Sequence, residues 1–167
     1  MKEKIDFFTP KCSVFNITTK KFGICDGENE SPAFVDQEHE DSWVAIVNNE
    51  TDDPLIFTAI DHCVDFPRSK EEMDNRCDAI LRGSNHLIFI ELKDQRADWI
   101  QKAVNSQLQT TIDYFKENHD LTKFQKRKAY VCNRAHPQFK FSHKELMQNF
   151  RNRNGIRLYI ENRIVIK

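Results

Sequence analysis

An acid on one apolar segment and a Glu-Leu-Lys triplet on the next form the most informative pattern in this sequence. Asp78 opens the first segment, and Glu91-Leu92-Lys93 ends the second. Residues two apart in a strand share a face, so Glu91 and Lys93 project together while Leu92 points the other way. Two carboxylates beside an ammonium group could hold a hydrated magnesium ion near a phosphate and assist attack by water.

The elements that carry these residues are predicted to form a hairpin. Residues 77–81 and 86–92 flank Arg82-Gly83-Ser84-Asn85, which is typical of a tight turn. A two-residue turn at Gly83-Ser84 places Asp78 diagonal to Glu91 on one face, about 7 Å or less between β-carbons. A four-residue loop keeps the acids on one face, whereas a three-residue loop turns Asp78 away. The alternative is a Glu–Lys salt bridge on a surface hairpin.

The remaining apolar patterns predict a single α/β domain with a central mixed β-sheet flanked by helices. Helical spacing over residues 97–118 predicts the strongest helix, and a second helix is expected over 143–152, with Ser142 as its cap and Gly155 as its stop. Turn chemistry favours a further hairpin and a closing hairpin. The predicted strands are 12–17, 21–25, 43–47, 55–60, 128–132, 156–160 and 163–166, with the two hairpins formed by 43–47 with 55–60 and by 156–160 with 163–166.

Composition is typical of a cytoplasmic globular protein. The 167 residues suit one domain, and 39% of them are hydrophobic, with 13 Phe available for a core. No apolar run approaches the roughly 18 residues that span a bilayer, and no secretory signal is evident at the N-terminus, so we expect no membrane association. The five Cys are widely spaced without a Cys-x-x-Cys pair. We therefore expect reduced, mostly buried thiols.

Charge is distributed unevenly along the chain. Residues 1–66 carry 5 basic and 14 acidic side chains, residues 67–120 carry 8 and 10, and residues 121–167 carry 12 and 2. A basic C-terminal part, 121–167, could bind the backbone of a nucleic acid, although folding could also merge the two charge types into one mixed surface. The residues expected to contact nucleic acid are Arg127, Lys128, Arg134, Arg151 and Arg153.

The sequence resembles the PD-(D/E)XK nuclease superfamily in three features. These are an acid on one apolar strand, a Glu-x-Lys triplet on the next strand and a helix after that triplet. The resemblance covers roughly residues 60–133, within a core of about 43–135. It implies a restriction-endonuclease-like fold and hydrolysis of DNA with Mg²⁺, for which Mn²⁺ could substitute. Asp78, Glu91 and the carbonyl of Leu92 would then bind the metal, Lys93 would assist the water or the transition state, and Gln107 on the following helix would be the catalytic-site glutamine.

The sequence departs from the family pattern at two points. Cys77 stands where the motif has Pro, and no strong early helix supplies a further acidic ligand. The acidic loop 26–32 is expected to be solvated. A catalytically inactive member that binds nucleic acid or a protein partner, and a small interaction module, are the alternatives to an enzyme. Nucleases that cut both strands are often paired, which would imply a homodimer. The candidates for an additional ligand are Glu38, Glu40, Asp61, Glu71 and Glu72.

Overall fold

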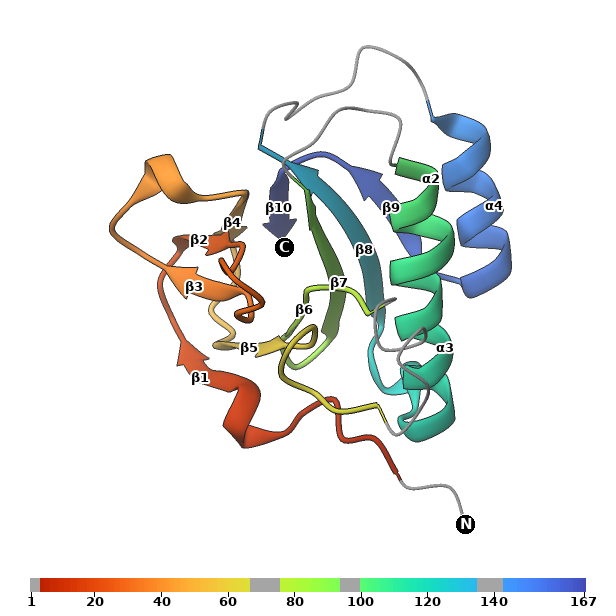
Figure 1. The fold of residues 1–167 in the computed structure, drawn as a ribbon, viewed down its shortest axis with the longest axis horizontal. Helices are drawn as coiled ribbons and strands as arrows, with labels where there is room; N and C mark the ends of the chain where they lie inside the picture. Colours follow the sequence, from red (N-terminus) through yellow and green to blue (C-terminus); the bar gives the residue numbers. More distant parts are fainter. Residues whose placement is uncertain (1–3, 67–75, 94–99, 135–142) are drawn as a thin grey trace.

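Two mixed β-sheets pack face to face in the computed structural model, and helices cover the outer face of the larger sheet (Figure 1). The structure describes residues 4–66, 76–93, 100–134 and 143–167. The chain is therefore a single α/β domain. The prediction of one central sheet flanked by helices is wrong in its number of sheets, because a second sheet covers one face of the larger one.

The larger sheet has six strands in the order β1-β5-β6-β7-β8-β9. β1, β5, β6 and β7 pair antiparallel, whereas β7, β8 and β9 run parallel. Because β7 has a neighbour on each side and a layer on each face, seven of its eight residues are buried. The strands are β1 (Ser13–Ile17), β5 (Leu55–Ala59), β6 (Ala79–Arg82), β7 (His86–Lys93), β8 (Lys126–Asn133) and β9 (Arg157–Ile160).

The smaller sheet has four strands in the order β10-β4-β2-β3, and β10 runs parallel to β4. Its strands are β2 (Lys21–Cys25), β3 (Phe34–Asp36), β4 (Ala45–Asn49) and β10 (Arg163–Ile166). Two predicted hairpins are wrong, because β4 and β5, like β9 and β10, lie in different sheets. Ile164 and Ile166 of β10 are fully buried between the sheets, and this burial favours pairing with β4 over a local hairpin with β9.

One long helix lies over β7 and β8 and starts, in the described residues, at Ile100. It consists of α2 (Ile100–Lys102), a π-helical segment (Ala103–Leu108) and α3 (Gln109–Asn118). The helical spacing predicted from the sequence is confirmed, since its apolar positions from Ile100 to Ile112 are buried in the core. Short 3₁₀ turns lie at Pro10–Cys12, Glu40–Ser42 and Leu121–Lys123.

The second helix, α4 (Lys144–Asn154), packs beside β9 at the edge of the larger sheet (Figure 1). Gly155 ends it in the left-handed region at φ 67°, where the missing side chain avoids a steric clash, so the predicted stop is confirmed. The predicted cap Ser142 lies outside the described residues. No helix in the described ranges is long and apolar enough to cross a membrane.

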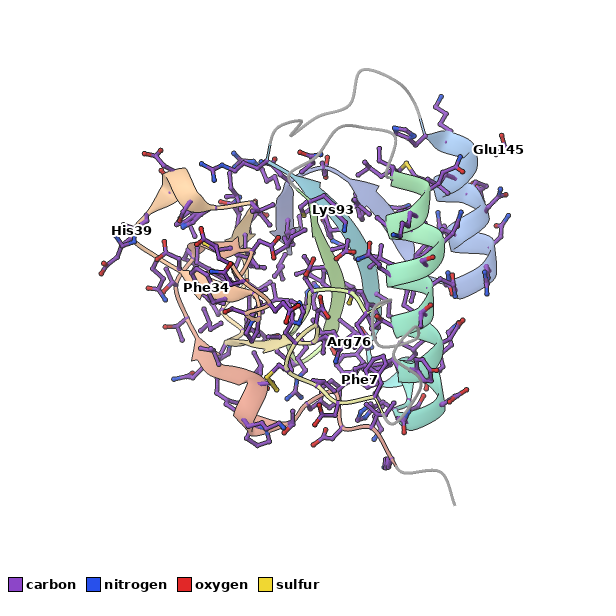
Figure 2. All side chains as sticks on the ribbon, in the orientation of Figure 1. Phe7, Phe34, His39, Arg76, Lys93 and Glu145 are labelled. Carbon is purple, nitrogen blue, oxygen red and sulfur yellow. A yellow bond between two sulfur atoms is a disulfide. The ribbon has the colours of Figure 1, made fainter. Side chains whose placement is uncertain are left out.

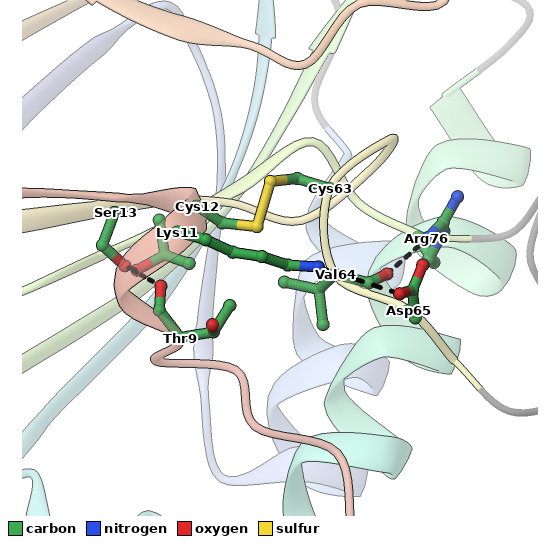
Figure 3. The surroundings of a disulfide bond; sticks show 9 residues. Thr9, Lys11, Cys12, Ser13, Cys63, Val64, Asp65 and Arg76 are labelled. Atoms are coloured by element: carbon green, nitrogen blue, oxygen red, sulfur yellow. Dashed lines mark hydrogen bonds and ion pairs between the residues drawn. A yellow bond between two sulfur atoms is a disulfide. The ribbon is translucent and has the colours of Figure 1, made fainter.

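Cys12 and Cys63 form a disulfide, which corrects the expectation that all five Cys are reduced (Figure 3). The bond joins the start of β1 to the loop after β5, and these strands are neighbours in the sheet. Residues 51 apart in sequence therefore have Cα atoms only 5.9 Å apart. Cys25, Cys77 and Cys132 are free and buried, as expected.

Reduction of this disulfide is expected to lower the free energy of unfolding by about 4 kcal/mol, the loop-closure value for a crosslink spanning some 50 residues. Urea unfolding with and without a reductant measures the effect. A Cys12→Ser/Cys63→Ser double variant should already be destabilised and insensitive to reductant. An unchanged unfolding midpoint on reduction would show that the tethered strands hold together without the bond.

Candidate active site

Asp78 and Glu91 face each other across the β6–β7 hairpin. The register pairs Ala79 with Ile90, so the next pair along the ladder is Asp78 with Glu91. The hairpin turns at Ser84-Asn85, where the Gly83 N–H donates to the His86 carbonyl at 3.0 Å. The predicted turn position was wrong by one residue, but the loop still keeps both acids on one face. The acids are therefore direct rather than diagonal neighbours.

The Asp78 carboxylate is fixed against the end of β7. Its Oδ2 atom accepts a 2.7 Å hydrogen bond from the Leu92 N–H, and its own N–H donates to the Ile90 carbonyl at 3.1 Å. The Leu92 side chain points into the core between the sheets, as the alternation predicts. Backbone contacts on both sides of Glu91 therefore position the Asp78 side chain beside it.

Glu91 is a fully buried acid without a hydrogen-bond donor among the described residues. Its side chain is 0% exposed, and neither Oε1 nor Oε2 has a hydrogen-bond partner there. Burial raises the pKa of Glu91 well above its usual range, and the neighbouring Asp78 raises it further. A buried carboxylate in this state is costly unless a proton or a cation joins it. The geometry therefore leaves a position for positive charge between the two acids.

Lys93 supplies an ammonium group next to this position. It lies at the end of β7 (Figure 2), and its Nζ atom is 3.8 Å from Glu91 Oε2. At that separation the two groups attract electrostatically but form no hydrogen bond. The side chain of Lys93 is 24% exposed, so it can contact both the buried acid and a ligand arriving from solvent.

Gln107 lies in the π-helical segment that packs over β7. The backbone carbonyl of Gln107 accepts a 2.8 Å hydrogen bond from the Thr111 hydroxyl. That hydroxyl in turn accepts a 2.8 Å hydrogen bond from the backbone N–H of Cys77, the residue before Asp78. The Gln107 Oε1 atom is buried and has no donor among the described residues. Three buried acceptor atoms on Glu91 and Gln107 thus lack a donor, and π-helical segments are frequent at functional sites.

Asp61 is the additional acid that the sequence placed correctly near this strand end. The N–H groups of Ile60 and Asp61 donate to the carbonyls of Asp78 and Cys77, which extends the β5–β6 ladder to the site. The Asp61 carboxylate pairs with the buried Arg76 at 3.2 Å. Burial raises the pKa of Asp61, while His62 and Arg76 oppose the shift.

Asp26 comes to the same region from the smaller sheet, directly after β2. It is exposed, yet partial burial against the protein and repulsion from Asp78 raise its pKa to about 6, while Lys93 opposes the shift. Sequence reasoning missed this residue and assigned loop 26–32 to solvent. No local signal could reveal it, because only the packing of the two sheets brings Asp26 close to Asp78.

Two other predicted acids, Glu38 and Glu40, take no part in this cluster. Glu40 is exposed and pairs with Lys21, and Glu38 is exposed beside Asp36. Glu71 and Glu72 lie outside the described residues.

The five predicted nucleic-acid contacts do not form one surface. Neighbouring positions Arg127 and Lys128 point to opposite faces of β8. Arg134 bonds to the carbonyl of Asp41 beside the smaller sheet, and Arg153 pairs with Asp113 at 3.7 Å. Arg151 is exposed on α4, without an ion pair to another described residue.

The donor set fits a hydrated hard cation. No three His, Cys, Asp or Glu side chains of the described residues are placed to enclose a metal together. Magnesium, however, binds through one or two carboxylates and keeps several waters. Asp78 and the donor-free Glu91 provide such a pair of carboxylates, and Lys93 Nζ lies beside them.

Comparison of this chain with protein-family models, with curated proteins and with solved structures finds no match in any of the three.

Proposed function

We propose that this protein is a magnesium-dependent nuclease of the PD-(D/E)XK type, with a restriction-endonuclease-like core, that hydrolyses phosphodiester bonds in DNA. The observation that carries the proposal is Glu91, a fully buried carboxylate with no donor on either oxygen, opposite Asp78 and 3.8 Å from Lys93. A structural salt bridge on a hairpin does not require an acid to be buried in this way.

The proposed magnesium ligands are Asp78, Glu91 and the carbonyl of Leu92, and Mn²⁺ is expected to substitute. When bound, the ion supplies Lewis-acid stabilisation of charge on the phosphate and a more acidic water. The two carboxylate ligands have separate structural supports: the Leu92 N–H orients Asp78, and Glu91 is fully buried.

The protein's own groups would orient the reactants. The Lys93 ammonium group offers positive charge to the phosphate oxygens as they become more negative. Gln107 offers a buried amide oxygen that can accept a hydrogen bond from a positioned water. Restricting solvent access strengthens each of these interactions, because the local dielectric is low.

The alternative is a nuclease-fold protein that binds nucleic acid or a protein partner without cutting. The pairing of Asp61 with Arg76 favours it, because this ion pair withdraws the nearest additional acid from metal binding. The two functions differ in a single measurement, which is turnover.

The test is nicking of supercoiled plasmid in the presence of Mg²⁺ or Mn²⁺. We expect cleavage by the unaltered protein and a loss of at least about 100-fold in Asp78→Asn, since even outer partners of metal ligands contribute 10–100-fold. The side-chain amide oxygen of this variant can still accept from the Leu92 N–H, so the fold should be kept. The exposed Glu50→Gln is the matched control. Salt-sensitive DNA binding without any cleavage by unaltered protein would favour the non-catalytic alternative.

A further inference from the structure

A basic groove runs between α4 and the edge strand β9, apart from the proposed active site. Its volume is about 420 Å³. Three cations line it, Lys144 and Arg151 from α4 and Arg157 from β9, while Met147, Leu158 and Tyr159 add apolar and aromatic surface. Lys144, Met147 and Arg151 recur at helical spacing, so they present one stripe of α4 to the strand.

The cations of this groove are available to a ligand. Lys144, Arg151 and Arg157 are exposed, and none of them pairs with a carboxylate of the described residues. Arg157 is hydrogen-bonded to Tyr159, which raises the pKa of Arg157 and keeps its charge at the groove. Three charges of one sign around a concave surface are complementary to a polyanion.

The apolar part of the groove discriminates between polyanions. Tyr159 is half-buried and stacks on Tyr130 with ring centroids 4.8 Å apart, which holds the aromatic wall rigid. Met147 is half-buried, and Leu158 is 1% exposed. A duplex presents phosphates but keeps its bases stacked inside, whereas a single strand can place an unpaired base against such a surface.

The strand register places the groove near the proposed catalytic end of the sheet. Tyr159 pairs with Tyr130, and Tyr130 pairs with Ile90, the residue before Glu91. Two strand spacings amount to about 10 Å across the sheet. Tyr159 and Tyr130 face the smaller sheet, whereas Glu91 points to the helix-covered face, so the aromatic wall of the groove and the proposed catalytic acids lie on opposite faces of the larger sheet.

We propose that the groove between α4 and β9 binds an unpaired segment of nucleic acid, with phosphates on Lys144, Arg151 and Arg157 and a base against Met147 and Tyr159. The conclusion about the substrate rests on the proposed nuclease function, whereas the proposed binding of nucleic acid in the groove does not. The substrate implied is DNA with a single-stranded segment, such as an overhang or flap.

Binding is measured by fluorescence anisotropy with a labelled 12-nucleotide oligo-dT in EDTA, so that metal and cleavage play no part. Three phosphate contacts predict a slope of log K against log salt of about −2. Arg151→Gln and Arg157→Gln should each weaken binding about five-fold at 0.1 M salt and flatten the slope by about 0.7. Arg163→Gln, an exposed cation on β10, is the matched control and should leave both unchanged.

Two comparison ligands test the single-strand assignment. An abasic oligonucleotide of the same length should bind at least about five-fold more weakly than oligo-dT, which is the contribution of one stacked base. A duplex of the same length should bind less tightly than oligo-dT. Equal binding of the abasic strand, tighter binding of the duplex, or equal effects of Arg151→Gln and Arg163→Gln would each overturn the proposal.

These outcomes are separate from those of the cleavage assay. Groove-dependent binding by a protein that never nicks plasmid would support this site and contradict the nuclease. Cleavage that is independent of Arg151 and Arg157, on substrates with and without single strands, would support the nuclease and contradict this site.

Discussion

Glu91→Gln is expected to stabilise the metal-free protein while abolishing its response to magnesium. The carboxylate of Glu91 is buried without a donor, and an unpaired buried group of this kind costs about 1–3 kcal/mol or more. The Gln amide is neutral and can donate to Asp78. We expect the melting temperature in EDTA to rise by about 2–10 °C. Millimolar Mg²⁺ should raise the melting temperature of the unaltered protein but not of the variant, which should also fail to cut.

The same buried acid should make the stability of the metal-free protein depend on pH. The pKa of Glu91 is raised in the folded state, so the native protein binds more protons than the unfolded chain above about pH 4.3. The stability of the metal-free protein should therefore fall as pH rises through the raised pKa, and Glu91→Gln should remove that part of the decline. Asp26, whose pKa is raised to about 6, contributes a loss of stability of the same sign as pH rises through that value.

A matched control for this experiment is Glu50→Gln, which alters an exposed acid directly after β4. A variant Glu91→Gln that melts below the unaltered protein at pH 8 in EDTA would mean that the carboxylate is already neutralised by a partner. The metal-site proposal would then lose its main support.

Lys93→Met is expected to remove cleavage without removing metal binding. The Lys93 ammonium group lies 3.8 Å from the Glu91 carboxylate. Loss of a single group that stabilises charge in the transition state costs about 10²–10³-fold in turnover. The Asp78–Glu91 pair is untouched by this change, so Mg²⁺ should still raise the melting temperature. Single-turnover cleavage and a thermal melt with and without Mg²⁺ separate the two effects.

The matched control is Lys102→Met, which removes an exposed lysine of α2, away from the two carboxylates. If Lys93→Met cuts as fast as the unaltered protein, Lys93 serves only as a partner of Glu91. The proposed catalytic role of Lys93 would then be wrong, although the nuclease activity itself would stand.

Local sequence patterns were sufficient for the central part of this site. Strand alternation and a turn of even length place Asp78 and Glu91 on one face, and that prediction survived an error of one residue in the turn position. Helical spacing identified the helix over β7, and Gly155 marked the end of α4. These features depend on residues close in sequence, where backbone geometry and side-chain periodicity act directly.

Pairings between distant segments depended on the tertiary structure. The second sheet forms because β10 buries Ile164 and Ile166 against β4 rather than turning back on β9, and the choice depends on total apolar burial. The packing of the two sheets brings Asp26 toward Asp78, and the pairing of β1 with β5 brings Cys12 within bonding distance of Cys63. The sequence by itself determined which residues could do chemistry, whereas the fold decided which acids meet, because burial and proximity are set by contacts across the whole chain.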